Sequence, residues 1–275
     1  MRNNINHSEN KEQYSPGYGK ELIQSFQQRS IIREAAFFVP YLRNDMTLLD
    51  CGCGPGTITS GLAQLLTHGE VIAIDIEPGQ IEQAQAYALE KGITNIQFKT
   101  SSIYNLPFPN SQFDAVFAHA VFQHLNDPLS ALEEIKRVLK PGGIVGLRDD
   151  DQGSLLLAPE TPQMEKVIVL LKQFMRHSGG NPSVGRKHRE LLRKAGFINT
   201  QAFASCEYDG NYDSTNKRGT LAAKLIEHMT NIAIDQGWAN ANEMKELELA
   251  SKQWGEDPDA FDAIIWCEAI GWRKE

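Results

Sequence analysis

The chain has 275 residues, of which 41% are hydrophobic and 23% are charged, and its formal net charge is −8. This length and composition are typical of a globular protein that buries a full hydrophobic core. The 35 acidic residues outnumber the 27 basic ones. Because phosphate backbones are held by clustered Lys and Arg, this balance argues against a nucleic-acid-binding protein.

The four cysteines do not form a zinc-binding pattern, since Cys51 and Cys53 are one residue apart and no second close pair exists. The N-terminus is polar and has no apolar run typical of a signal peptide, and no stretch of about 18 apolar residues occurs. We therefore expect no bound metal, no membrane span and a cytoplasmic protein with free thiols.

The pattern of apolar residues predicts elements in a regular order. A helical pattern from Lys20 to Tyr41 indicates that residues 1–41 form a tail and a helical flap. The strands expected next are 46–50, 71–75, 96–99, 113–118 and 144–148. The helices expected between them are 57–66, 78–90 and 128–139, the last with Asp127 as its N-cap. This alternation predicts an α/β fold with a parallel, doubly wound sheet that helices cover on both faces.

The regular alternation ends after Arg148. Helices are expected at 161–175 and 186–195, then a strand at 197–207, two helical patterns near 221–235 and 241–254, and a last strand at 263–270. We expect residues 42–207 and 263–275 to form a cofactor-binding domain and residues 208–262 to be a helical insertion. Insertions at the rim of a sheet often form lids over pockets.

The strongest motif is the segment LLDCGCGPGTIT at residues 48–59. Asp50 ends a strand, and Gly52, Gly54 and Gly56 alternate through a turn into a helix. Glycine allows a positive φ and lets a ligand approach bare backbone, while the helix start presents free N–H groups. The dinucleotide fingerprint G-x-G-x-x-G would require a third glycine where Thr57 stands. The motif therefore favours a cofactor with an ammonium and a carboxylate at the turn over a pyrophosphate.

Asp75 ends the second expected strand. An acid at this position of a doubly wound sheet accepts hydrogen bonds from the two hydroxyls of a ribose. This feature alone fits a nicotinamide dinucleotide as well as an adenosyl cofactor. An NAD(P)-dependent oxidoreductase therefore stays open as an alternative.

Four segments resemble, in order and spacing, the class I S-adenosylmethionine-dependent methyltransferases: DCGCGPG, VIAIDIEP, SSIYNLPFPNSQFDAVFAHAVFQHLNDP and EEIKRVLKPGG. The nearest group is the one related to ubiquinone and menaquinone biosynthesis methyltransferases. The resemblance is strong over residues 42–148. It implies a Rossmann-like sheet of seven strands, S-adenosylmethionine as the cofactor and S-adenosylhomocysteine as its product.

The resemblance also implies roles for single residues. Gly52, Gly54 and Gly56 would cradle the methionine part of the cofactor, with Asp50 steadying the turn, and Asp75 would hold the ribose.

The adenine ring would lie against Ile76, with Gln80 near the same ring. The family usually has an Asp where this chain has Ser102, so adenine recognition is expected to rest more on the backbone of Ile103.

Four further features are candidates for contact with the cofactor or the acceptor. Arg29 stands where related proteins have an arginine that reaches the cofactor carboxylate, and Tyr18 lies in the preceding loop; the alternative for Arg29 is a solvated surface residue. His119 follows the fourth strand, where its backbone would line the cofactor and its imidazole is a candidate general base. The acidic run from Asp149 to Asp151 is expected to be a solvated loop, with an anchor for the acceptor as the alternative.

The expected activity is methyl transfer to a small molecule. An activated methyl group is displaced directly, so the protein needs no nucleophile of its own. Aromatic residues in the insertion are consistent with a hydrophobic or aromatic acceptor. The alternative from another class is a non-catalytic scaffold that binds S-adenosylmethionine.

Overall fold

The structure is a computed structural model and describes residues 26–275. Its centre is a seven-stranded sheet with the strand order β3-β2-β1-β4-β5-β7-β6. The strands are β1 (Thr47–Cys51), β2 (Glu70–Asp75), β3 (Ile96–Thr100), β4 (Phe113–His119), β5 (Leu139–Ala158), β6 (Ile198–Asp209) and β7 (Phe261–Trp272). The first five strands are parallel, as expected, whereas β7 runs antiparallel to β5 and β6 on either side of it. The sheet is therefore mixed rather than wholly parallel.

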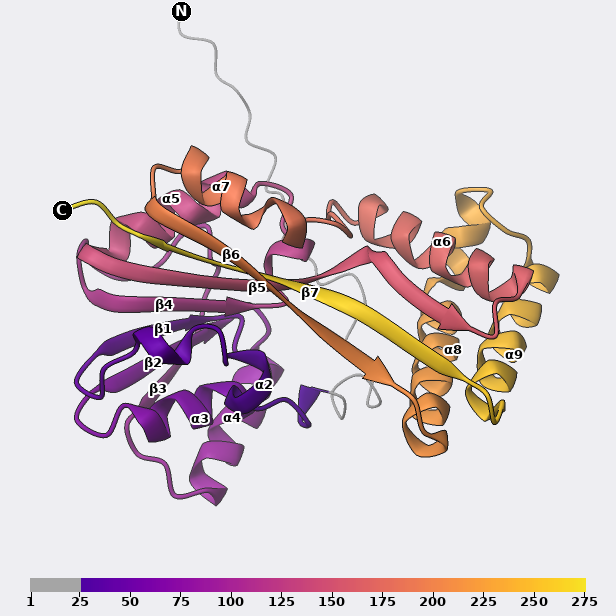
Figure 1. Cartoon of the computed structure of the whole chain (residues 1–275), viewed down its shortest axis with the longest axis horizontal. Helices are drawn as coiled ribbons and strands as arrows, with labels where there is room; N and C mark the ends of the chain where they lie inside the picture. The colour runs from indigo at the N-terminus through magenta and orange to yellow at the C-terminus, as the bar shows by residue number, and fades with distance from the viewer. Residues whose placement is uncertain (1–25) are drawn as a thin grey trace, which may run out of the picture.

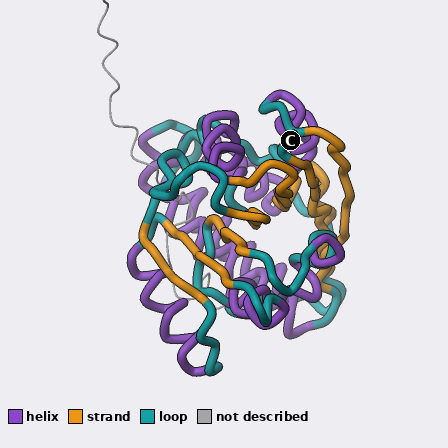
Figure 2. The backbone as a smooth tube through the Cα atoms, turned by 90° about the vertical axis from the view of Figure 1, so that its left-hand side faces the viewer, coloured by secondary structure: helices purple, strands orange, loops and turns teal. Residues whose placement is uncertain are grey.

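Helices cover both faces of the parallel strands (Figure 2). They are α3 (Thr57–Leu65), α4 (Pro78–Glu90), α5 (Pro128–Val138) and α7 (His188–Lys194). Successive residues of a strand point to opposite faces, so Leu48 packs in one core with Leu62 of α3, and Leu49 packs in the other with Leu132 of α5. The N-cap predicted for α5 is confirmed, because the Asp127 carboxylate accepts a hydrogen bond from the Ser130 amide at 3.1 Å.

The N-terminal segment differs from the expected long helix. In its described part, Phe26 is helical, and the chain then forms α2 (Ile31–Glu34) and a 3-10 turn at Val39–Tyr41. After α2 the chain turns so that Ala35 and Phe38 are completely buried against the core beside α3. Burial of these two side chains outweighs the helical periodicity, and Pro40 has no amide hydrogen with which to continue a helix.

The last three strands of the sheet are longer than expected. β5 continues ten residues past Arg148, and β6 and β7 pair with each other beyond the parallel strands. Figure 1 shows these strands crossing the molecule to a group of helices at the far end. That group, which we call the helical cover, consists of α6 (Pro162–His177), α8 (Tyr212–Asp235) and α9 (Ala241–Glu256).

The helical cover has a hydrophobic core of its own. Val167 and Phe174 of α6 pack in one cluster with Ile226 of α8 and with Met244 and Trp254 of α9. We expected α6 to belong to the cofactor-binding part, but its buried side chains lie with those of the insertion. Of the helices that the structure describes, none is long and apolar enough to cross a membrane.

Candidate active site

A pocket opens at the carboxyl ends of β1, β2 and β4, where ligands of open α/β sheets bind. We call it the glycine-loop pocket, because the turn between β1 and α3 forms its floor. Nine of the residues expected to bind the cofactor line it: Arg29, Asp50, Gly52, Gly54, Asp75, Ile76, Gln80, Ile103 and His119. Tyr18 lies outside the described residues, and Gly56 and Ser102 are not among the lining residues.

The three glycines of the turn differ in their tasks. Gly52 has a φ of +75°, and a Cβ there would lie 2.3 Å from Cγ2 of Val121. At Gly54 the φ is +52° and the nearest atom to such a Cβ is Oε1 of Gln80 at 3.9 Å, so bare backbone faces the pocket. A Cβ at Gly56 would lie 2.8 Å from that of Ala84 in α4. Gly56 therefore allows helix packing, which explains why it does not line the pocket.

Asp75 ties the glycine turn to the end of β2. Its Oδ2 accepts a hydrogen bond from the Gly54 amide at 2.9 Å, and its Oδ1 accepts one from the Glu77 amide at 3.0 Å. Burial raises the pKa of this carboxyl above its usual range, although the two hydrogen bonds act to lower it. A carboxylate oxygen can accept more than one hydrogen bond, so both atoms can still accept from ribose hydroxyls.

Asp50 is a buried acid beneath the same turn. The Thr59 hydroxyl donates to its Oδ2 at 2.6 Å. Burial raises the pKa of Asp50 to about 7, and the negative charge of Asp75 adds to this shift. A ligand that brings an ammonium group into the pocket would stabilise the ionised form, which fits the expected cofactor.

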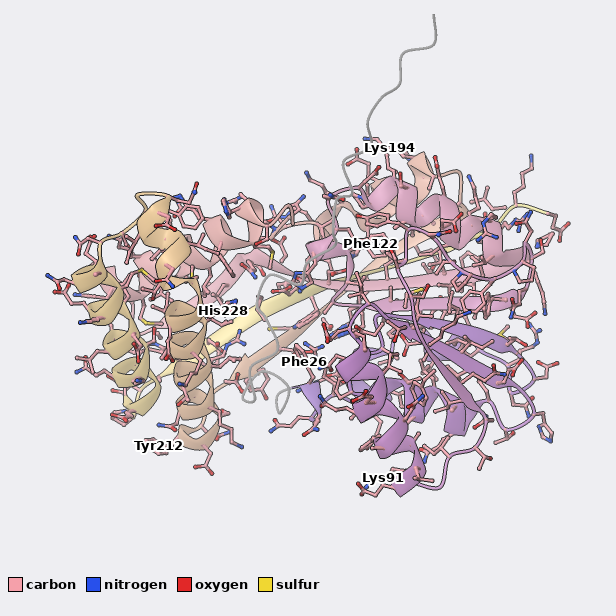
Figure 3. All side chains as sticks on the ribbon, turned by 180° about the vertical axis from the view of Figure 1, so that it is seen from behind. Phe26, Lys91, Phe122, Lys194, Tyr212 and His228 are labelled. Carbon is pink, nitrogen blue, oxygen red and sulfur yellow. The ribbon has the colours of Figure 1, made fainter. Side chains whose placement is uncertain are left out.

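Ile76 and Ile103, the residues expected near adenine, form an apolar part of the pocket wall. The Ser102 side chain makes a local hydrogen bond, since its hydroxyl oxygen accepts from the Tyr104 amide at 3.1 Å. The neighbouring Ser101 lines the pocket in its place. Sequence reasoning missed Ser101, and also Phe26, which Figure 3 shows on the side of the sheet that faces the helical cover.

His119, the candidate general base, lies in the pocket wall, and its contacts in the structure are with Arg148 and Trp266. Its Nε2 is 2.8 Å from Nη1 of Arg148, and its ring stacks on Trp266 with centroids 5.0 Å apart. Burial lowers the pKa of His119 well below its usual value, and Arg29 and Arg148 lower it further. Since an arginine only donates, Nε2 accepts and the ring proton sits on Nδ1. In this arrangement Nδ1 has no hydrogen-bond partner among the described residues.

Arg148 is the centre of a buried charge network and is completely inaccessible to solvent. Its Nη2 lies 2.6 Å from Glu207 in β6, and its Nε lies 3.1 Å from Glu268 in β7. The Ser205 hydroxyl also donates to Glu268 at 2.7 Å. Because the two carboxylates are 59 and 120 residues away along the chain, no local pattern indicated this network.

The acidic run after Arg148 is not the expected solvated loop, because β5 continues through it. Asp149 is buried and accepts a hydrogen bond from the Gln123 amide at 3.0 Å, and its Oδ2 lies 2.9 Å from Nε2 of His188. Asp151 is also buried, accepts from the Gly153 amide at 2.9 Å and pairs with Arg186. Strand alternation turns Asp150 to the opposite face, where it lines a second pocket.

Comparison with known proteins shows the family to which the chain belongs. Residues 42–256 match the protein family described as a methyltransferase domain. The Aspergillus luteorubrus protein named "Probable methyltransferase ltbC" is 31% identical, over 94% of this chain and 97% of that protein. The demethylmenaquinone methyltransferase of Lactococcus lactis is 30% identical, over 67% of this chain and 79% of that protein.

A solved structure shows the same fold. The YcgJ protein of Bacillus subtilis superimposes with a TM-score of 0.60 and 20% sequence identity, over 89% of this chain and 99% of that one. With the glycine turn, the two acids at the strand ends and the family match together, the chain belongs to the class I S-adenosylmethionine-dependent methyltransferases.

Proposed function

We propose that this methyltransferase acts on a small-molecule acceptor by direct displacement. The observation that carries the proposal is the glycine-loop pocket, in which bare backbone at Gly54 and the buried acids Asp50 and Asp75 line one cavity. When bound there, S-adenosylmethionine supplies a methyl group already activated on a sulfonium, so the protein needs no nucleophile. The tasks of the chain are then to bind, to orient and to exclude water.

The residues present fit the cofactor at each end of the pocket. Asp50 offers a negative charge to the ammonium, and Arg29 lines the pocket as a partner for the carboxylate. Asp75 accepts from the ribose hydroxyls, and Ile76 and Ile103 enclose the adenine between apolar side chains. Burial keeps His119 neutral, so it does not repel a cationic sulfonium.

The part of the molecule next to His119 favours a small acceptor over a macromolecule. Beyond His119 the long strands reach the helical cover, whose hydrophobic core also contacts Leu157 of β5, and α8 of the cover contacts β6. The net charge of −8 disfavours a nucleic acid. The expectation that the acceptor is hydrophobic or aromatic is consistent with the apolar side chains of the cover.

Calorimetric titration tests the cofactor site. The wild-type chain is expected to bind S-adenosylhomocysteine, and Asp75→Ala to weaken binding at least about tenfold, because a buried acceptor for two hydroxyls is lost. Asp45→Ala is the control, since Asp45 is an exposed acid. Tight binding of NAD(P) without any response to S-adenosylhomocysteine would support the oxidoreductase alternative and contradict the proposal.

Transfer of a labelled methyl group tests the acceptor class. The protein is incubated with methyl-labelled S-adenosylmethionine and an extract, which is then separated into small molecules, protein and nucleic acid. The label is expected in the small-molecule fraction. Label in protein or nucleic acid alone would refute the proposal, and saturable cofactor binding without any transfer would favour the non-catalytic scaffold.

A further inference from the structure

A second pocket lies between the projecting ends of β5 and β7 and the helices α6 and α8, and we call it the cover pocket. Figure 1 shows these helices at the far end of the two strands. Its apolar wall includes Val167 and Leu171 of α6, Leu221 and Leu225 of α8 and Trp254 of α9. The indole N–H of Trp254 donates to the carbonyl oxygen of Ala158 at 3.0 Å. This contact satisfies the polar edge of the ring, so the wall is suited to an apolar body.

The charged residues of the cover pocket differ in whether they have a partner. Arg218 is paired with Asp262, its Nε lying 2.7 Å from Oδ2 of that carboxylate. Asp150 contributes a buried atom, Oδ1, which has no hydrogen-bond partner among the described residues. A buried acceptor without a partner costs free energy that a ligand donor would recover. The unpartnered Oδ1 of Asp150 therefore offers a position for a hydrogen-bond donor, in a wall that also includes Gln152.

The charges around Asp150 decide which kind of donor fits. Burial raises the pKa of Asp150 to about 6, and the charge of Asp149 adds to this, while Arg218 and Arg29 oppose it. An anion would be repelled by Asp150 and Asp262. A cation would be placed beside Arg218 in a largely apolar cavity, where charge is costly. A neutral hydroxyl avoids both costs.

The position of Asp150 relates the cover pocket to the glycine-loop pocket. Asp150 is paired with Trp266 across β5 and β7, and residues directly opposite each other in an antiparallel pair share a face. Trp266 in turn stacks on His119, which lines the glycine-loop pocket. Asp150 therefore stands at the end of the cover pocket that adjoins the cofactor site, with the apolar wall leading away from it.

We propose that the cover pocket binds the methyl acceptor, and that this acceptor is an apolar molecule whose hydroxyl group donates a hydrogen bond to Asp150. The inference rests on the proposed function and adds to it a binding site and a substrate class. The apolar body lies against α6 and α8. Asp150 holds the hydroxyl end towards the glycine-loop pocket, which orients the molecule for transfer.

The experiment measures binding of 1-naphthol as the probe by calorimetry, with 1-methoxynaphthalene as the matched ether that cannot donate. With saturating S-adenosylhomocysteine present, the wild-type chain is expected to bind 1-naphthol at least about fivefold more tightly than the ether, the size of one net hydrogen bond. Absence of 1-naphthol binding, or its displacement by S-adenosylhomocysteine, would overturn the inference. Tighter binding of 1-naphthylmethylammonium than of 1-naphthol would also overturn it, because the pocket would then prefer a cation.

Two variants locate the site. Asp150→Leu is expected to reduce the preference for 1-naphthol over its ether below about twofold, because the acceptor oxygen is gone. Ala222→Phe fills the pocket and is expected to weaken both compounds at least about tenfold. Ala86→Phe, at an exposed helical alanine of α4, is the matched control and should leave both affinities unchanged.

Binding of S-adenosylhomocysteine separates the two levels of the proposal. It should stay within about twofold of wild type in all three variants, which also shows that they are folded. Suppose that Ala222→Phe keeps its affinity for S-adenosylhomocysteine and also binds 1-naphthol as tightly as wild type does. The assignment of the acceptor site is then wrong, and the proposed function stands. If the wild-type chain does not bind S-adenosylhomocysteine, the proposed function itself fails.

Discussion

The two pockets of this protein are built in different ways. The glycine-loop pocket lies at the turns that follow β1, β2 and β4, and its lining includes the bare backbone of a recognisable glycine motif. The cover pocket has no such motif and consists of side chains from β5, β7, α6, α8 and α9. The first pocket therefore has a signal in neighbouring residues, while the proposed site for the acceptor depends on how separate elements pack.

The largest effect is expected where the two regions meet. Arg148→Met leaves the buried carboxylate of Glu268 without its cation, and removal of one partner from a buried pair costs about 3–5 kcal/mol of unfolding free energy. Urea denaturation measures this loss. Arg43→Met is the control: Arg43 pairs with Asp45 at 3.3 Å, but the two side chains are 65% and 63% exposed, so less than about 1 kcal/mol is expected. Equal losses in the two variants would contradict the expectation that the buried network contributes more to the unfolding free energy than an exposed ion pair does.

The second prediction tests whether the glycine-loop pocket depends on backbone shape. Gly52→Ala forces a Cβ into Val121 at a positive φ, so S-adenosylhomocysteine affinity is expected to fall more than about tenfold. Gly92→Ala is matched, because Gly92 has a φ of +66° but open space around it at the end of α4. It should reduce stability by about 1–2 kcal/mol and leave the affinity unchanged. Calorimetry that finds the affinity unaffected in Gly52→Ala would contradict this account.

The third prediction concerns pH. Since burial raises the pKa of Asp50 to about 7, the unliganded folded protein holds a proton there below pH 7. A bound ammonium favours the ionised carboxylate, so binding of S-adenosylhomocysteine must release that proton in acid. Affinity is expected to rise with pH up to about 7, by at most about tenfold per unit, and to level off above it. Asp50→Asn should flatten the profile, while Asp45→Asn should not; calorimetry from pH 5 to 8 decides.

The smallest effect is expected in the helical cover. Asn240 caps α9, because its side chain accepts from the Glu243 amide at 3.1 Å while the Glu243 carboxylate accepts from the Asn240 amide at 2.8 Å. Asn240→Ala is expected to reduce the unfolding free energy by about 1 kcal/mol, measured by urea denaturation. S-adenosylhomocysteine affinity should not change. A loss of affinity would show that the two regions are coupled more strongly than their separate cores suggest.

Much of the cofactor-binding half was predictable from the sequence because its signals are local. The glycine turn, the acids at the ends of β1 and β2, and the cap of α5 at Asp127 each depend on residues within a few positions of one another. At two positions the structure adds a task that the local pattern did not indicate. A Cβ at Gly56 would meet Ala84 of α4, and Ser101, next to Ser102, lines the pocket.

The sequence by itself determined the alternating strands and helices and the glycine turn, because hydrophobic periodicity and backbone requirements are written in neighbouring residues, and its resemblance to a family implied the cofactor. Only the tertiary structure decided that β5 continues through Asp149 to Asp151 and that Arg148 donates a hydrogen bond to Nε2 of His119. It also decided that α6 packs with α8 and α9 beside a second pocket. Those features depend on burial and on partners far away along the chain, for which a local pattern has no signal.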